Sequence, residues 1–97
     1  MIRHIVLFNF VEGTPPERID QVERDLLAYV EPLDGVRSYV IGRNAGLTPT
    51  AFEFSVVAEF DDEAAFVAYA RGDRHLEIVR ELAEIVGERA SSQSRLD

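Results

Sequence analysis

Three side chains of this sequence are suited to acid–base chemistry: Tyr69, His75 and His4. Tyr69 and His75 lie six residues apart in the stretch AYARGDRHLEIV (68–79), with a helix-breaking glycine between them. Histidine exchanges protons near neutral pH, and a buried tyrosine hydroxyl requires a hydrogen-bond partner. The pair is therefore a candidate for general acid–base catalysis with His75 as the base.

The position of His75 near the start of a helix favours its neutral form. We expect Asp73 to cap this helix, which places His75 in the first turn. The unpaired N–H groups of that turn disfavour an imidazolium, although the Asp73 carboxylate acts in the opposite direction. The helical spacing of His75, Val79, Leu82 and Val86 directs the ring inward. His75 is then either a base or a core histidine bonded to the backbone.

His4 and Tyr69 have a structural interpretation beside the functional one. His4 alternates with Phe8 and Phe10 along one face of the first predicted strand. If that face looks toward the helices, His4 can approach Tyr69 and His75 and form a polar wall. Otherwise His4 is a buried histidine at a subunit interface. Tyr69 either orients His75 or a substrate carbonyl, or it fills the core.

Composition excludes several classes of function. The formal net charge of −8 argues against a protein that binds nucleic acid through phosphates. All ten positive charges are arginines, so neither a Schiff base nor a phosphate-binding lysine is available. The absence of cysteine excludes thiolate catalysis, disulfides and cysteine-based zinc sites. No stretch reaches about 18 uninterrupted apolar residues, so we expect no membrane span. Without disulfides there is no sign of secretion, so we expect a cytoplasmic location. We also expect no cofactor.

Hydrophobic periodicity supplies the elements that must position these residues. Alternation predicts strands over residues 2–11, 36–41 and 52–60. The TPPE stretch predicts a helix with Thr14 as its N-cap, Pro15 in its first turn and Glu17 completing a capping box. Two more helices are expected on either side of the Gly72 break. The weakly apolar tail, residues 88–96, is a candidate fourth strand.

The order strand–helix–strand, which occurs twice, predicts an α+β fold of the ferredoxin-like type, with one domain over residues 1–97. Its antiparallel four-stranded sheet carries helices on one face only. The first strand is apolar on both faces, because Ile5 and Leu7 alternate with Val6 and Phe8. A second copy of the chain is the simplest cover for the bare face, so we expect a homodimer.

The sequence resembles the Dabb, or stress-responsive A/B barrel, family in MIRHIVLFNF (1–10), GRN (42–44) and FSVVAEFDDEAAFVAYARGDRH (54–75). The resemblance covers roughly residues 1–86 and implies a dimeric α+β barrel. Among the plant polyketide cyclases of this family, a tyrosine and a histidine six residues apart carry out acid–base catalysis without metal or cofactor. Tyr69 and His75 match that spacing, and His4 matches the family's first-strand histidine.

Two departures from the family pattern stand out. Asp73 occupies a position where the family usually has proline, which affects the turn before His75. The tail over residues 89–96 is less apolar than the family's last strand.

Two functional hypotheses follow. In the first, a pocket binds a small apolar carbonyl or aromatic compound and catalyses enolisation or aldol ring closure. In the second, a stress-associated dimer binds the same ligand without catalysis. Phe8, Phe10, Phe54 and Val79 are expected to contact the ligand. A metal site of two histidines with Glu53 or Glu59 is a weaker alternative, because these glutamates lie opposite the phenylalanine face.

Overall fold

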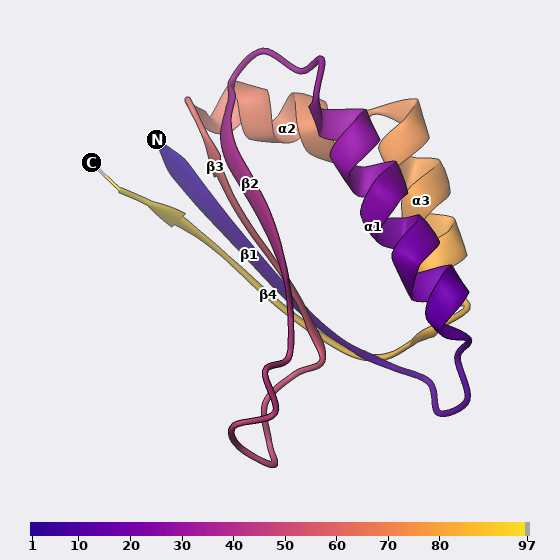
Figure 1. The fold of residues 1–97 in the computed structure, drawn as a ribbon. Coiled ribbons are helices and arrows are strands. Elements are labelled where there is room, and N and C mark those ends of the chain that lie inside the picture. The colour runs from indigo at the N-terminus through magenta and orange to yellow at the C-terminus, as the bar shows by residue number, and fades with distance from the viewer. Residues whose placement is uncertain (97) are drawn as a thin grey trace.

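A computed structural model describes residues 1–96, which form a four-stranded antiparallel sheet with three helices on one face (Figure 1). The strand order is β2-β3-β1-β4. This arrangement confirms the predicted ferredoxin-like α+β fold. None of the helices within residues 1–96 is long and apolar enough to cross a membrane. The elements are β1 (Ile2–Phe10), α1 (Pro16–Val30), β2 (Val36–Arg43), β3 (Phe54–Phe60), α2 (Glu63–Arg71), α3 (Asp73–Ala83) and β4 (Val86–Arg95).

The hydrophobic core lies between the helices and the inner face of the sheet. In β1, alternate residues are buried on this face, among them Val6 and Phe8. They pack with Leu26 of α1 and with Ile78 and Leu82 of α3. Burying one such side chain stabilises the fold by roughly 1.5–3 kcal/mol. His4 lies on the same face as these residues and is 6% exposed, so its side chain points toward the helices.

The fourth strand, β4, pairs with β1 along its length and confirms the strand predicted in the tail. It begins at Val86, so Val86 belongs to the strand and not to the helical stripe on which we had placed it. Most β4 side chains are exposed, because the strand lies at the edge of the sheet. In the register of the two strands, Arg89 lies opposite Phe8 and Gln93 lies opposite His4. Directly opposite residues share a face, so both side chains belong to the helix side.

The start of α1 differs from the prediction. Pro15 occupies the N-cap position and the helix begins at Pro16, without a side-chain cap. The Thr14 hydroxyl donates instead to the carbonyl oxygen of Val11 at 2.6 Å. Because that bond closes the preceding turn, the capping box predicted with Glu17 does not form.

The outer face of the sheet carries no helix and is partly apolar (Figure 1). Ile5 and Leu7 of β1 lie half-buried there. Val57 in β3 is 37% exposed and Val40 in β2 is 61% exposed. The register places Val40 opposite Val57, and Val57 opposite Ile5. An isolated chain therefore exposes a connected apolar area at the centre of this face.

Candidate functional site

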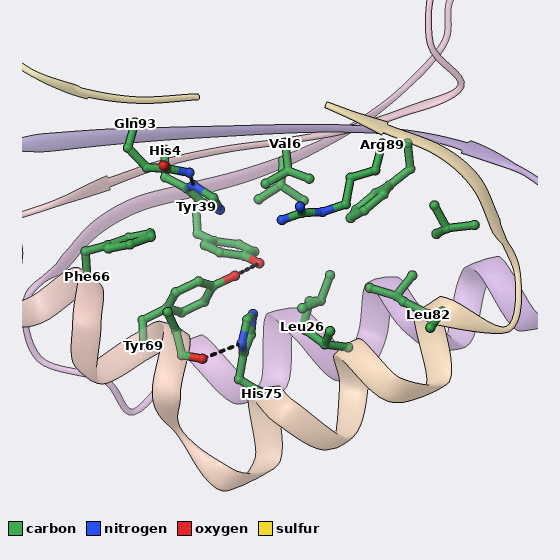
Figure 2. Close-up of a pocket in the computed structure, with 16 residues that line it drawn as sticks. His4, Val6, Leu26, Tyr39, Phe66, Tyr69, His75, Leu82, Arg89 and Gln93 are labelled. Carbon is green, nitrogen blue, oxygen red and sulfur yellow. Dashed lines mark hydrogen bonds between the residues drawn. The ribbon is translucent and has the colours of Figure 1, made fainter. Parts of the chain in front are cut away.

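A cavity of about 430 Å³ lies between the inner face of the sheet and the helices (Figure 2). This volume is within the range of sites that bind small molecules. Most of the lining is aliphatic or aromatic, with a few polar groups directed inward. The polar side chains that line it are His4, Tyr39, Tyr69, His75, Arg89 and Gln93.

The three residues predicted for acid–base chemistry all line this cavity. His4 comes from β1, Tyr69 from α2 and His75 from α3, so the fold brings together residues that are up to 71 positions apart in sequence (4 to 75). Phe8 and Val79, which we expected to contact the ligand, also line it.

Phe10 and Phe54, also expected at the ligand, lie outside the lining. Phe54 is 1% exposed, and its ring packs against both Phe8 and Phe10, with centroids 6.0 and 5.6 Å apart. Alternation along β3 correctly grouped Phe54 with Val56 and Phe60 on one face, which the structure turns toward the helices. It could not distinguish a core position from a cavity wall, because both lie on that face.

The junction between α2 and α3 depends on Gly72. A Cβ atom on residue 72 would overlap the Tyr29 hydroxyl, which comes from α1. That hydroxyl donates to the carbonyl oxygen of Tyr69 at 2.8 Å. Gly72, and not Asp73 as predicted, is the N-cap residue of α3, so Asp73 is the first helical residue. His75 nevertheless lies in the first turn, two residues later.

The His75 ring is oriented by the end of the preceding helix. Its Nδ1 atom lies 3.1 Å from the carbonyl oxygen of Ala70, one of the C-terminal carbonyl groups of α2 that lack a helical partner. A carbonyl only accepts, so Nδ1 carries the proton and Nε2 keeps its lone pair. Figure 2 shows the ring rising from the helix side into the cavity.

His75 is shifted toward its neutral form. Burial is the main cause of its lowered pKa, the Ala70 carbonyl acts against it, and the charge of Arg89 lowers it further. The direction agrees with the expectation from the sequence, but burial replaces the helix dipole as the main cause. The Nε2 atom is therefore available to accept a proton at neutral pH.

Tyr69 is paired with Tyr39 and not with His75. The two hydroxyl oxygens lie 2.8 Å apart. The Tyr69 ring packs against the His75 ring with centroids 4.5 Å apart, so Tyr69 supports His75 by contact, while the orienting hydrogen bond comes from Ala70. Burial raises the pKa of Tyr69 to about 12, and the bond from Tyr39 partly opposes this shift. Burial raises the pKa of Tyr39 as well, so both hydroxyl groups keep their protons at neutral pH.

His4 is held by the last strand. The side-chain amide nitrogen of Gln93 lies 2.9 Å from its Nδ1 atom. An amide nitrogen donates, so Nδ1 accepts and the proton of the neutral ring lies on Nε2. Burial, followed by the charges of Arg89 and His75, lowers the pKa of His4 to about 4. His4 is thus a neutral hydrogen-bond donor at the wall of the cavity.

Reasoning from the sequence missed Tyr39, Arg89 and Gln93. Tyr39 lay in a predicted strand whose inner face we had not assigned. Arg89 and Gln93 lie in β4, whose polar sequence hid its alternation. Placing β4 beside β1, in the observed register, would have put both residues on the face of Phe8 and His4.

The cavity holds one group able to accept a proton and one able to donate a hydrogen bond. The Nε2 atom of His75 accepts a proton, and the Tyr39–Tyr69 pair keeps one hydroxyl proton that is not used in the bond between them. Within residues 1–96, no group of three or more histidine and carboxylate side chains is arranged to hold a metal ion. Glu53 and Glu59, considered above as metal ligands, are not among the lining residues.

The family model of the Stress responsive A/B Barrel Domain (Dabb) matches residues 2–93 of the chain. Among solved structures, a dimeric ferredoxin-like protein of unknown function from Thermobifida fusca is 29% identical, with a TM-score of 0.89 over 98% of this chain and 90% of that one. A Dabb family protein from Mesorhizobium loti is 22% identical, with a TM-score of 0.80 over 97% and 94%.

A third structure, the hydroxynitrile lyase from Passiflora edulis, is 17% identical, with a TM-score of 0.86 over 99% of this chain and 93% of that one. At this identity the likeness shows the fold alone. No curated protein matches the chain.

Proposed function

The chain belongs to the stress-responsive A/B barrel (Dabb) family, and from that premise we propose that it binds a small, largely apolar carbonyl compound and acts on it by cofactor-free acid–base chemistry. His75 is the proposed base and Tyr69 the proposed hydrogen-bond donor, while His4 is a polar wall of the site. Enolisation, or aldol ring closure of a polyketide-like substrate, is the reaction class that fits these groups.

The observation that carries this proposal is the state of the His75 ring. Its Nδ1 proton is bonded to the Ala70 carbonyl, and its free Nε2 atom faces an apolar cavity. A histidine that serves only the core usually has both ring nitrogens satisfied by the protein or by water. The arrangement at His75 instead leaves one basic atom for a ligand.

The proposed reaction begins when His75 Nε2 removes a proton from the carbon next to the ligand's carbonyl group. The C–H electron pair becomes the C=C bond of an enolate, and the Tyr69 hydroxyl donates a hydrogen bond to the oxygen that gains negative charge. In a ring closure, the enolate carbon bonds to a second carbonyl carbon of the same molecule. The oxygen of that second carbonyl then takes the proton from His75.

The homodimer is part of this proposal. The outer face of the sheet exposes Val40 and Val57 next to the half-buried Ile5 and Leu7. The Thermobifida fusca structure is described as dimeric. Packing the outer faces of two copies together would remove the apolar area from water while leaving each cavity, on the opposite side of its own sheet, intact.

A second candidate is a dimer that binds the same ligand without catalysis. The observation in its favour is that the Tyr69 hydroxyl bonds Tyr39, so the tyrosine and the histidine share no direct hydrogen bond. On this hypothesis the cavity retains a carbonyl compound, with His75 and the tyrosine pair serving only as binding groups.

Deuterium exchange distinguishes the two candidates. The methylene group next to the ketone of 4-oxo-4-phenylbutanoate exchanges with D2O, and proton NMR follows the exchange. A catalytic protein accelerates it, and His75→Ala lowers the acceleration about 10²–10⁴-fold. Leu76→Ala, the matched control, changes an exposed neighbour on α3 and keeps the full rate. Saturable binding without acceleration would support the non-catalytic candidate.

A further inference from the structure

Arg89 is a cation at the wall of an otherwise uncharged cavity. It lies in β4, on the inner face of the sheet, and lines the cavity together with Val6, Phe8 and Val86. Within residues 1–96, its guanidinium group forms neither an ion pair nor a side-chain hydrogen bond, unlike those of Arg3, Arg37 and Arg43. Figure 2 shows this group directed from the sheet side into the cavity, across from His75.

The charge of this cavity is opposite to the charge of the protein. The chain has 18 acidic residues and a formal net charge of −8, yet no aspartate or glutamate among residues 1–96 lines the cavity. Both lining histidines are shifted toward their neutral forms and both lining tyrosines keep their protons. Arg89 is the one formal charge in the lining, so the cavity carries a charge of about +1 at pH 7.

The charge of Arg89 acts across the cavity. It contributes to the lowered pKa of His4 on the sheet and of His75 on α3. An anion bound to Arg89 would therefore lie where it also influences the proposed base. An unpaired guanidinium group next to aliphatic walls suits a ligand that carries its own negative charge and an apolar body.

We propose that the cavity selects apolar carbonyl compounds that bear a carboxylate, and that Arg89 binds this carboxylate. The proposal rests on the function proposed above and narrows its substrate class. Arg89 binds the carboxylate at the sheet side of the cavity. The rest of the same molecule then extends toward His75 on the helix side. The single positive charge of Arg89 balances the single negative charge of a carboxylate. A phosphate monoester carries a charge of about −1.5 to −2 at pH 7, and the part beyond −1 would have no cation to balance it among these residues.

The test compares two ligands of the same shape. Binding of 4-oxo-4-phenylbutanoate and of its primary amide to the intact protein is measured by NMR titration at pH 7. We expect the carboxylate to bind about 10- to 100-fold more tightly, the difference expected for hydrogen bonds to a charged group. Equal affinities, tighter binding of the amide, or no binding of the carboxylate at millimolar concentration would overturn the proposal.

Arg89→Gln should reduce the affinity for the carboxylate to that of the amide and leave the amide unaffected. Arg89→Lys should retain part of the preference. The matched control is Arg80→Gln, an exposed arginine of α3 that lies outside the lining and should keep the full preference. A preference that survives Arg89→Gln overturns the role of Arg89, and the comparison of the two ligands on the unmodified protein stands even if that variant does not fold.

The outcome is separable from that of the proposed function. Binding depends on Arg89, whereas acceleration of deuterium exchange depends on His75. A protein that prefers the carboxylate but does not accelerate exchange would retain the ligand class and lose the catalytic proposal. A protein that accelerates exchange equally for the acid and the amide would retain catalysis and lose the anionic ligand.

Discussion

The Nδ1 atom of His75 lies 3.1 Å from the carbonyl oxygen of Ala70, five residues earlier in the preceding helix. This contact fixes the proton on Nδ1, whereas the amide of Gln93 fixes the proton of His4 on Nε2. We therefore predict that the two histidines of this chain are opposite tautomers at pH 7.5. Nitrogen-15 shifts of the two imidazole rings measure this directly. An Nε2–H tautomer at His75 would contradict the assignment of His75 as the base.

His4 should make the protein less stable in mild acid. Its pKa is lowered to about 4, mainly by burial and also by Arg89 and His75, while in the unfolded chain it is near 6.5. Between these values the unfolded state binds more protons, so the free energy of unfolding falls as the pH drops from 6.5 to 4. We expect His4 to account for at most about 3 kcal/mol of this loss.

The measurement for His4 is urea unfolding at pH 7 and pH 4.5 with the wild type and His4→Gln. Carboxylates of the protein titrate in both proteins, so the difference between the two pH dependences isolates the histidine. The variant should lose less stability between the two pH values. Identical losses would show that His4 is protonated to the same extent in the folded and unfolded states, and would contradict the lowered pKa.

Gly72→Ala should destabilise the protein by about 1–3 kcal/mol, because the added methyl group overlaps the Tyr29 hydroxyl and displaces it from the Tyr69 carbonyl. The backbone of Gly72, with φ −60°, is accessible to alanine, so the effect is steric. Thermal or urea unfolding measures the change. Gly87→Ala is the control, because its new Cβ would meet only ordinary contacts.

A double-mutant cycle identifies the cause of the Gly72 effect. Removing the hydroxyl with Tyr29→Phe should reduce the destabilisation caused by Gly72→Ala, since part of the overlap disappears. Additive effects of the two substitutions would assign the loss to something other than this contact.

Val57→Arg should dissociate the proposed dimer, because it places a charge in the centre of the outer sheet face. Light scattering at micromolar concentration should give about twice the 10.9 kDa chain mass for the wild type and a lower mass for the variant. Leu76→Arg is the matched control, since Leu76 is 42% exposed on α3 and Val57 is 37% exposed. Monomeric wild-type protein would disprove the dimer.

Most of the fold was predictable from the sequence because the inner strands alternate strongly. Alternation predicted that Ile2, His4, Val6 and Phe8 share one face of β1, and that Phe54, Val56, Ala58 and Phe60 share one face of β3. The structure turns both faces toward the helices, a direction that the sequence left open. Helix ends were less predictable. The Thr14 hydroxyl bonds the preceding turn, and Gly72 takes the N-cap position that Asp73 was expected to occupy.

The site was only partly predictable, and for a different reason. Tyr69 and His75 are close in sequence, so their spacing alone indicates that they are neighbours. The side chains of Tyr69 and His4 bond to Tyr39 and Gln93, which come from strands that are distant in the sequence. The pairing register of a strand is normally read from its pattern of apolar residues. The edge strand β4 carries polar residues on the face that lines the cavity, so its register cannot be read in this way. Arg89 could therefore be found only from the structure.

Because β4 lies at the edge of the sheet, most residues that stabilise the fold are separate from those that β4 presents to a ligand. Most buried residues that hold the fold lie in the helices and inner strands, whereas Arg89 and Gln93 line the cavity from a strand whose side chains are mostly exposed. Substitutions of Arg89 change the charge offered to a ligand and disturb little of the core, whereas Gln93 must keep its hydrogen bond to the buried His4. Ligand preference can therefore evolve at Arg89 at low cost in stability, and this position of β4 is the one to randomise when the specificity of this scaffold is to be redesigned.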